Sequence, residues 1–245
     1  MLKDANDLCV VLVGTRNPLN LGAAARAMSN FGFLRLRVVN PYALAFRQAR
    51  SAVGAAPLLA GAQEYPSLAE AVADCTLVVG TTAIGHRELH HPLRRLEYGA
   101  RLIRKELGHG QVALVFGTEK TGLSNQDLCH CHWLININTR QRLSMNLGQA
   151  VAVCLYELVR APRTVKASAQ DPAVRATAKE VELISQALLQ ALYLSGYVNP
   201  IAVSTTEERL RRLVRRMQVS SSDASLWLGM LRQILWKLQT TNSGT

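Results

Sequence analysis

A turn that joins an apolar run to a helix carries the first residues that could do chemistry. From Gly14 the chain passes through Asn17 and Pro18 into an amphipathic stretch that contains Gly22 and Arg26. Such a turn at the carboxyl end of a parallel strand is where α/β proteins bind ligands. Gly22 and Arg26 lie one helical turn apart, opposite the apolar stripe, where a bulky substrate could approach. The alternative is an ordinary loop followed by a solvated arginine.

A second candidate segment, Val115–Leu123, follows another apolar run and forms a short loop bounded by glycines. Gly117 would let the backbone approach a ligand closely, since glycine has no Cβ. Glu119 could accept hydrogen bonds from a hydroxyl group or hold the loop itself. Taken alone, a plain glycine turn with a solvent-facing acid explains the segment equally well.

A third segment, Leu143–Val151, leads into a long amphipathic helix and follows Ile137–Thr139. Ser144 and Asn146 are of the types that cap helix N-termini. Capping does not exclude a further role, because the free amide groups at a helix N-terminus also suit a carboxylate group of a ligand.

The elements that must position these segments alternate along the first two-thirds of the chain. Apolar runs separated by amphipathic stretches predict an α/β domain over residues 1–160, with parallel strands covered by helices. We expect strands at Leu8–Val13, Arg35–Val39, Thr76–Gly80, Gln111–Phe116 and Trp133–Ile137. We expect helices at Leu21–Phe31, Ser67–Ala73, Pro92–Leu107 and Asn146–Arg160.

The last third of the chain has a different pattern. Residues 161–172 contain two prolines among small and polar residues and are expected to form a linker. Residues 173–245 show apolar stripes at helical spacing and predict a small all-helical domain, too small to be very stable unless it docks on something. The stripes are Val181, Ile184, Leu188 and Leu192; Leu210, Leu213, Val214 and Met217; and Trp227, Leu231, Ile234, Leu235 and Leu238.

Composition narrows the class of protein. The formal net charge of the 245 residues is +11, and 22 of the 28 basic residues are arginine, whose planar fork suits phosphate. No run approaches the roughly 20 apolar residues of a membrane span, and Met1–Asp7 lacks the pattern of an export signal. Five cysteines, an odd count, argue against a disulfide framework. We expect a cytoplasmic protein that binds nucleic acid and no membrane.

Taken together and in order, the three segments resemble the motifs of the SpoU-like branch of the SPOUT superfamily of RNA methyltransferases. The first motif of that branch reads N-P-x-N-x-G-x-x-x-R, the second F-G-x-E-x-x-G-L and the third S-x-N-L before a helix. They are matched at Asn17–Arg26, at Phe116–Leu123 and by Ser144, Asn146 and Leu147. Each motif alone is weak evidence, but three at these spacings are strong.

The resemblance implies a fold, an activity and an assembly. The α/β domain would end in a C-terminal trefoil knot, and the protein would be a homodimer. It would use S-adenosyl-L-methionine to methylate a ribose 2′-hydroxyl of tRNA. The helical tail is similar to the extension of the bacterial enzymes that modify cytidine or uridine at nucleotide 32 of the anticodon loop.

The resemblance also assigns residues to roles. Arg26 takes the leading catalytic role, and because an arginine rarely gives up its proton, we interpret it as a clamp on a phosphate and the 2′-oxygen rather than as a base. The supporting catalytic residues are Asn20, Glu119, Ser144 and Asn146. The cofactor contacts are Thr81, Thr82, Ala83, Gly117, Ile137, Leu143, Ser144 and Met145. The expected RNA contacts are Arg16, Arg87, Arg209, Arg212 and Arg216.

Two features stand apart from the motifs. Cys129–His132 alternates cysteine and histidine, but alternation in an extended run sends neighbouring side chains to opposite faces, so we expect no metal site. The interval from Ile137 to Ser144 is one residue shorter than the family pattern, which weakens the assignment of Leu143.

Three alternative functions remain. The same chemistry could act on ribosomal RNA, since the motifs do not name a nucleotide. A catalytically silent RNA-binding protein could retain the fold. A small-molecule dehydrogenase would be expected to show an early G-x-G-x-x-G turn, which this sequence lacks.

Overall fold

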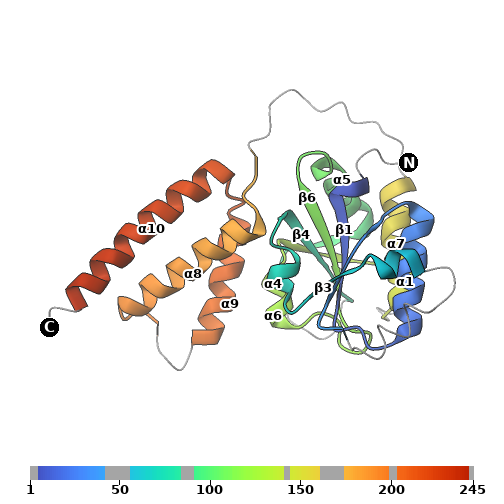
Figure 1. Cartoon of the computed structure of the whole chain (residues 1–245), viewed down its shortest axis with the longest axis horizontal. Helices are drawn as coiled ribbons and strands as arrows, with labels where there is room; N and C mark the ends of the chain where they lie inside the picture. The colour runs from blue at the N-terminus through green and yellow to red at the C-terminus, as the bar shows by residue number, and fades with distance from the viewer. Residues whose placement is uncertain are drawn as a thin grey trace.

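A seven-stranded, all-parallel sheet forms the centre of the molecule, with strand order β3-β2-β1-β6-β4-β7-β5 (Figure 1). The computed structural model describes residues 5–41, 56–83, 91–140, 144–160, 174–198 and 203–242. The strands are β1 (Leu8–Val13), β2 (Arg35–Val39), β3 (Gln63–Tyr65), β4 (Cys75–Thr81), β5 (Leu93–Arg95), β6 (Gln111–Phe116) and β7 (Trp133–Asn136). The helices beside them are the 3-10 turn η1 (Ala5–Asp7), α1 (Pro18–Phe31), α3 (Ala56–Ala60), α4 (Leu68–Ala71), α5 (Leu96–Glu106), α6 (Asn125–Leu128) and α7 (Leu147–Arg160).

Both faces of the sheet are buried, as the apolar runs predict. On β1, Leu8, Val10 and Leu12 point into the core under α1, α5 and α7, while Cys9 and Val11 point into the core on the opposite face. All six residues of β1 are buried. A strand covered on both sides cannot alternate between apolar and polar residues, which explains its continuous apolar sequence.

Helices α1 and α7 pack tightly against each other, and this contact fixes two of the three motif segments. A Cβ added to Gly148 would lie 2.5 Å from the Cβ of Ala23, so only glycine allows this approach. Asn17 caps α1 by accepting a hydrogen bond from the backbone N–H of Leu19 at 2.9 Å. Gly32 ends the helix with a left-handed φ of 79°. The first and third motifs are therefore held on neighbouring helices.

Most predicted elements are confirmed, with one clear error. Strands β1, β2 and β6 have the predicted bounds, and β4 and β7 differ only at their ends. The helix predicted at Pro92–Leu107 is wrong at its start, because Leu93–Arg95 pairs with β7 as an edge strand and α5 begins only at Leu96. The short elements β3, α3 and α6 were not predicted. Segments of three to five residues carry too little periodicity to be found from sequence.

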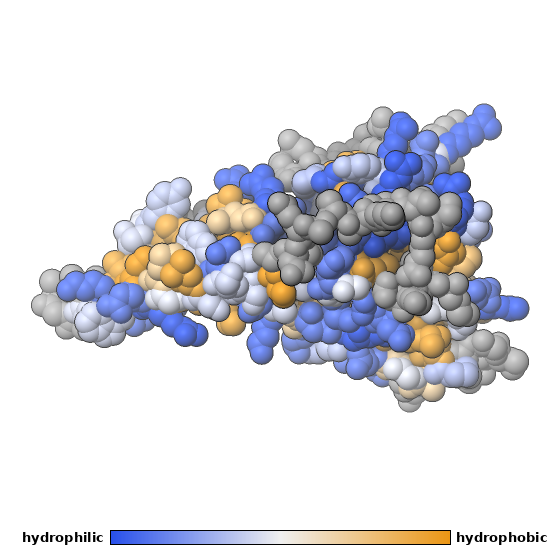
Figure 2. Space-filling model, turned by 90° about the horizontal axis from the view of Figure 1, so that it is seen from above, coloured by the Kyte–Doolittle hydropathy of each residue, from blue (hydrophilic) through white to orange (hydrophobic). Residues whose placement is uncertain are grey.

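In the part of the tail that the structure describes there are three helices, α8 (Ala178–Leu194), α9 (Val203–Arg216) and α10 (Ser221–Asn242), which lie beside the sheet domain (Figure 1). Their small core contains Val181, Ile184, Val214 and Leu231. The prediction for α9 is wrong in detail: Leu213 and Met217 are 45% and 48% exposed. Apolar side chains also stay on the surface of α10, and Figure 2 shows apolar surface over this end of the molecule. The residues are Leu226, Met230, Ile234 and Trp236.

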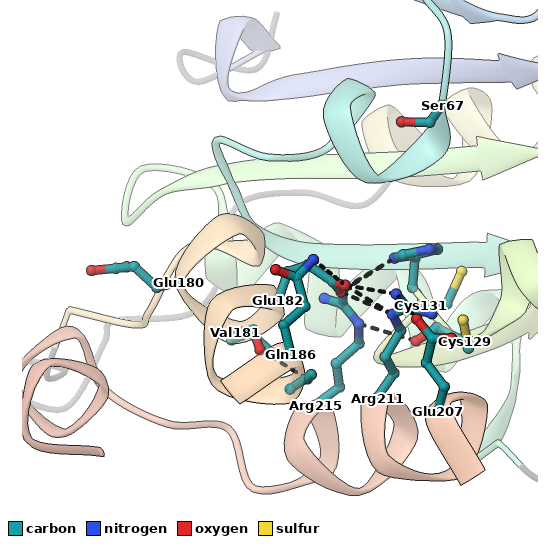
Figure 3. Close-up of polar contacts among 12 residues, drawn as sticks. Ser67, Cys129, Cys131, Glu180, Val181, Glu182, Gln186, Glu207, Arg211 and Arg215 are labelled. Atoms are coloured by element: carbon teal, nitrogen blue, oxygen red, sulfur yellow. Dashed lines mark hydrogen bonds and ion pairs between the residues drawn. The ribbon is translucent and has the colours of Figure 1, made fainter. Parts of the chain in front are cut away.

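A buried charged cluster joins the tail to the sheet domain (Figure 3). The side chain of Arg215 is 2% exposed, and its Nε donates a hydrogen bond to the backbone oxygen of Cys129 at 3.1 Å. Glu182 accepts two hydrogen bonds from Nε of Arg211, at 2.9 and 3.1 Å, and lies 3.5 Å from Nη2 of Arg215. The backbone N–H of Lys179 also donates to the oxygen of Ala73 at 3.0 Å. The tail thus docks on the domain through polar contacts.

Several expectations stay predictions. The trefoil knot is not tested, and residues 141–143 near the end of the domain lie outside the described ranges. The boundaries 1–160, 161–172 and 173–245 are likewise untested. Within the described ranges, no helix is both long enough and apolar enough to span a membrane. All five cysteines are free and buried.

Candidate binding site at the carboxyl ends of the central strands

A pocket of about 330 Å³ opens where the central strands β4, β6 and β7 end. This volume lies at the lower end of the range for small-molecule sites, roughly 300–1,000 Å³. Its walls come from loops that are distant in sequence. They are Thr81, Thr82 and Ala83 after β4; Phe116, Gly117, Thr118, Glu119, Lys120, Thr121, Gly122 and Leu123 after β6; and Ile135, Ile137, Thr139, Ser144, Met145, Leu147 and Ala150 from β7 to α7.

The loop after β6 is a closed turn that only glycine permits. Thr118 and Gly122 bond to each other's backbone, with N···O distances of 3.2 and 2.9 Å. A Cβ added to Gly117 would lie 2.1 Å from the carbonyl carbon of Gly122, a distance that no side chain tolerates. Gly122 itself has a φ of +70°. The two glycines of the second motif are therefore explained by backbone geometry.

Hydrogen bonds across the strand ends hold the opposite wall. The backbone N–H of Thr82 donates to Ile135 at 2.9 Å, and Nδ2 of Asn136 donates to the backbone oxygen of Thr82 at 3.0 Å. The hydroxyl of Thr81 donates to the backbone oxygen of Val115 at 3.0 Å. The β4 loop is thus tied to both neighbouring strands, and these hydrogen bonds hold the pocket wall in place.

A chain of hydrogen bonds brings the three motif segments together beside the pocket. Oε1 of Glu119 accepts from Nδ2 of Asn20 at 3.2 Å and from the backbone N–H of Asn17 at 3.3 Å. Oδ1 of Asn20 accepts from Nδ2 of Asn146 at 2.8 Å. Asn146 in turn caps α7 by accepting from the N–H of Gly148 at 3.0 Å. Residues 99 and 126 positions apart in sequence therefore form one network.

Arg26 does not lie in this pocket. Its side chain is exposed on α1, and it is not among the residues that line the pocket of its own chain. Leu21, Ala24, Ala25 and Met28, on the other side of the helix, are fully buried, as predicted. The first motif thus contributes its amides to the network, while its guanidinium faces away from its own core.

The predicted cofactor contacts lie together. Thr81, Thr82 and Ala83 form one wall, Gly117 a second, and Ile137, Ser144 and Met145 a third. Glu119 also lines the pocket, whereas Asn20 and Asn146 lie behind it in the network. Leu143 and Arg87 lie outside the described residues.

The arginines predicted to bind RNA lie on separate surfaces. Arg16 is exposed beside the first motif, and Arg209 and Arg216 are exposed on α9. Arg212 lies 3.9 Å from Glu208, one turn earlier on the same helix. The structure does not bring the α9 arginines to the pocket lining.

The Cys129–His132 segment is part of the buried interior. It follows α6 as a turn rather than as an extended run, so the argument from alternating faces does not apply. Nδ1 of His132 accepts a hydrogen bond from the backbone N–H of Val78 at 3.0 Å, and burial lowers the pKa of this histidine to about 3. Among the described residues, no group of three or more His, Cys, Asp or Glu could hold a metal. The absence of a metal stays a prediction.

Sequence reasoning missed several lining residues. Lys120 and Thr118 lie within the second motif, at positions the family pattern leaves open, and Thr139 belongs to the segment already noted. Asn17 was identified as a turn residue and as the start of the first motif, but its backbone hydrogen bond to Glu119 was not predicted. The spacing of the second motif could have indicated Lys120, because a tight loop exposes every residue at its tip.

The pocket suits a ligand with both polar and apolar parts. Ile135, Ile137 and Leu147 give it apolar walls, while threonine and serine hydroxyl groups and loop backbone offer hydrogen bonds. Glu119 and Lys120 are the charged residues of the lining. Because the described lining is neither strongly basic nor strongly acidic, the site can hold a ligand of mixed charge.

Comparisons with known proteins agree with this architecture. Residues 7–156 match the SpoU rRNA Methylase family. The chain is 36% identical over 234 residues to the tRNA (cytidine/uridine-2′-O-)-methyltransferase TrmJ of Klebsiella pneumoniae, covering 92% of this chain and 95% of that one. It is 34% identical to the protein of the same name from Pectobacterium atrosepticum, covering 97% and 98%.

Solved structures give the same result for the fold. A crystal structure of TrmJ from Z. mobilis is similar with a TM-score of 0.79 and 31% identity, covering 92% of this chain and 98% of that chain. A probable methylase family protein from Haemophilus influenzae is similar with a TM-score of 0.59 and 27% identity, covering 97% and 99%. Both comparisons include the helical tail as well as the sheet, since their coverage exceeds nine-tenths of the chain.

Proposed function

The chain belongs to the SpoU methylase family, and we propose that it transfers the methyl group of S-adenosyl-L-methionine to a ribose 2′-hydroxyl of tRNA. The observation that carries this proposal is the hydrogen-bonded meeting of three motif segments beside the pocket. The names of the relatives support cytidine and uridine as the target bases. The resemblance of the tail supports nucleotide 32 of the anticodon loop.

The pocket fits the cofactor. Its apolar walls suit an adenine ring, and the loop that Gly117 and Gly122 allow presents backbone groups rather than bulky side chains. When bound, S-adenosyl-L-methionine supplies a methyl group on a positively charged sulfur. We assign its binding to the loops of residues 81–83, 117 and 137–145, including Leu143, which lies outside the described residues.

The chain's own residues would orient the attacking hydroxyl and stabilise charge on it. Asn20, Glu119 and Asn146 hold the loops in register, and Ser144 lies at the pocket where a hydroxyl could be oriented. Arg26 would clamp a phosphate and the 2′-oxygen, because a guanidinium favours the developing alkoxide without losing its own proton. Alignment of the reacting atoms supplies the rest of the acceleration.

The exposed position of Arg26 supports a homodimer in which this residue serves the pocket of the second subunit. It lies outside the pocket lining of its own chain, so a partner must bring an equivalent residue to the site. In a two-fold dimer each subunit would give one arginine and receive one. Loss of Arg26 from one subunit would then inactivate the pocket of the other subunit.

Mixed dimers test this arrangement. Arg26→Ala and Asn146→Ala are each expected to abolish methyl transfer. When the two variants are unfolded and refolded together, a mixed dimer has one intact site if Arg26 acts across the interface. Random pairing then restores about a quarter of the wild-type activity. No restored activity, with dimers present by light scattering, would mean that Arg26 acts within its own subunit or not at all.

The substrate is tested with labelled cofactor and separate pools of tRNA and ribosomal RNA. Methylation of tRNA, with the modified nucleotide mapped by mass spectrometry, is the expected result. Label in ribosomal RNA alone would support the same chemistry on that substrate. Cofactor binding by calorimetry without methylation of either pool would support a silent RNA-binding protein.

The remaining assignments complete the proposal. Residues 161–172 link the methyltransferase domain to a helical extension that binds tRNA, and the enzyme works in the cytoplasm. Its RNA contacts are Arg16, Arg87, Arg209, Arg212 and Arg216. Arginines suit this role because their fork binds phosphate oxygens.

A further inference from the structure

Strand β5 and the start of α5 carry a group of basic and aromatic residues outside the motifs. The β5–α5 basic patch consists of Arg94, Tyr98 and Arg101. Arg101 is exposed and Tyr98 is 51% exposed, whereas Arg95, the next residue of β5, leaves the opposite face of the strand. Tyr98 and Arg101 are three residues apart on α5 and therefore neighbours on its surface.

The patch adjoins the proposed cofactor pocket through the sheet register. On β5, Arg94 pairs with Ile135 of β7, which lines the pocket. Arg95 pairs with Asn136, whose side chain holds the backbone of Thr82 in the pocket wall. Adjacent strands lie about 4.8 Å apart, so the two arginines begin one strand away from the wall.

Aromatic rings, not an acid, hold Arg94 in place. Its guanidinium carbon lies 5.4 Å from the ring centre of Tyr98 and 5.4 Å from that of Trp133. Its Nε is buried and has no hydrogen-bond partner, and the described residues offer it no ion pair. Stacking fixes the plane of a guanidinium but leaves its charge available to an anion.

Positive charge accumulates along this side of α5. Arg104 lies one turn beyond Arg101, and its Nη1 donates to the backbone oxygen of Glu157 at 2.8 Å, so it is used structurally. Burial lowers the pKa of Arg104; the charge of Glu157 raises it, and the charges of Arg101 and Arg160 lower it. Like charges placed together cost stability, and an anionic partner would offset that cost.

We propose that the β5–α5 basic patch binds the phosphate backbone of the RNA strand beside the nucleotide that enters the pocket. This inference rests on the proposed function, because it takes RNA as the substrate. Arg94 contacts phosphate, Arg101 extends the track along α5, and Tyr98 and Trp133 position Arg94. The patch lies on the sheet domain and is separate from the arginines of α9.

Binding of unfractionated tRNA to the full-length protein tests the proposal. Arg94→Gln is expected to weaken binding about fivefold at about 0.15 M salt and to lower the slope of log affinity against log salt by about one, as for one lost phosphate contact. Arg232→Gln is the matched control. It removes one exposed arginine from α10 and is expected to change affinity less than twofold, roughly the effect of net charge alone.

A second pair of variants tests the positioning role of the ring. Tyr98→Ala is expected to weaken tRNA binding about threefold and to lower the salt slope, because Arg94 loses one of its two stacking partners. Tyr98→Phe keeps the ring and is expected to restore wild-type affinity and slope. Calorimetry with S-adenosyl-L-methionine, expected to be unchanged in every variant, verifies that the pocket remains folded.

The outcomes separate the inference from the proposed function. If the wild-type protein methylates tRNA but Arg94→Gln and Arg232→Gln bind it equally well, with equal salt slopes, the patch is not an RNA contact. If the wild-type protein methylates no RNA, the proposed function fails, whereas a specific loss of tRNA binding in Arg94→Gln would still support the patch.

Discussion

The pocket loops and the docked tail hold polar groups in place by different means. Around the pocket, side-chain amides, backbone groups and the single carboxylate of Glu119 form hydrogen bonds, and glycines let the loops close. At the tail, the buried guanidinium of Arg215 lies against the partly buried carboxylate of Glu182 and donates a hydrogen bond to the domain. The pocket network lies near solvent, whereas the guanidinium of Arg215 is enclosed.

This difference indicates which kinds of mutation each region tolerates. A loop that closes through backbone hydrogen bonds and glycine does not tolerate an added side chain. A buried ion cluster tolerates small changes of shape but not the loss of one charge, because the partner left behind is unpaired in a medium of low polarity. Mutations of the two regions should therefore have separable effects on ligand binding and on stability.

The largest expected effect is at the pocket loop. Gly117→Ala would place a methyl group 2.1 Å from the carbonyl carbon of Gly122, so the loop must open. We expect affinity for S-adenosyl-L-methionine to fall at least about a thousandfold, or ~4 kcal/mol, by calorimetry. Gly229→Ala is the control, since its added methyl has nothing within 4 Å and α10 gains helix propensity. Equal binding by both variants would contradict the loop geometry.

The next effect concerns the docked tail. Arg215→Ala removes a buried cation from Glu182 and leaves the backbone oxygen of Cys129 without its donor. The free energy of unfolding in urea is expected to fall by about 3 kcal/mol. This loss lies at the lower end of the values for broken buried ion pairs, because Arg211 still pairs with Glu182. Arg216→Ala, at the exposed neighbouring position, should change it by less than about 0.5 kcal/mol. Equal losses would mean that the cluster does not anchor the tail.

The same cluster predicts a dependence on pH. Burial, followed by the charge of Arg215, lowers the pKa of His130 to about 4, below its value of about 6.5 in an unfolded chain. The unfolded state therefore binds a proton more readily. The contribution of neutral His130 to stability is complete above pH 6.5 and is lost as the pH falls toward 4. As the pH falls from about 8 to about 5, His130 should lower the free energy of unfolding by ~2 kcal/mol.

The variant His130→Asn isolates that contribution. Unfolding in urea at both pH values should show a smaller pH dependence than in the wild-type protein. Burial alone would raise the pKa of Glu182, but Arg211 lowers it, so this acid adds its own loss of stability only at lower pH. His132, whose pKa burial lowers to about 3, should retain its effect in the variant. An unchanged pH profile would exclude His130 as its source.

The smallest expected effect concerns the exposed face of α9. Arg216→Glu is expected to weaken tRNA binding about fivefold, or ~1 kcal/mol, and to reduce its salt dependence, while leaving stability nearly unchanged. Arg212→Glu should act in the same direction, although its ion pair with Glu208 lessens the effect. Arg232→Glu on α10 provides the charge-matched control in filter binding. If all three variants bind tRNA alike, α9 has no special role.

Local patterns in the sequence were sufficient for much of the architecture. Continuous apolar runs predicted β1, β2 and β6 with their bounds, because strands buried on both faces consist mainly of apolar residues. The resemblance to the SpoU-like branch, and not a local pattern, indicated most of the residues that line the pocket. The edge strand β5 was mistaken for helix, since three residues pair with β7 through backbone bonds that leave no pattern of side chains.

The sequence alone specified the longer strands and helices and which residues stand at the motif positions, since these depend on interactions between near neighbours. The fold determined that Glu119 meets Asn20 and Asn146, that Arg26 turns away from the pocket of its own chain, and that Arg215 is buried while Leu213 is exposed. These outcomes depend on contacts between residues far apart in the chain. Hydrophobic periodicity measures only which side of an element avoids water, and the partner that covers that side is set by packing.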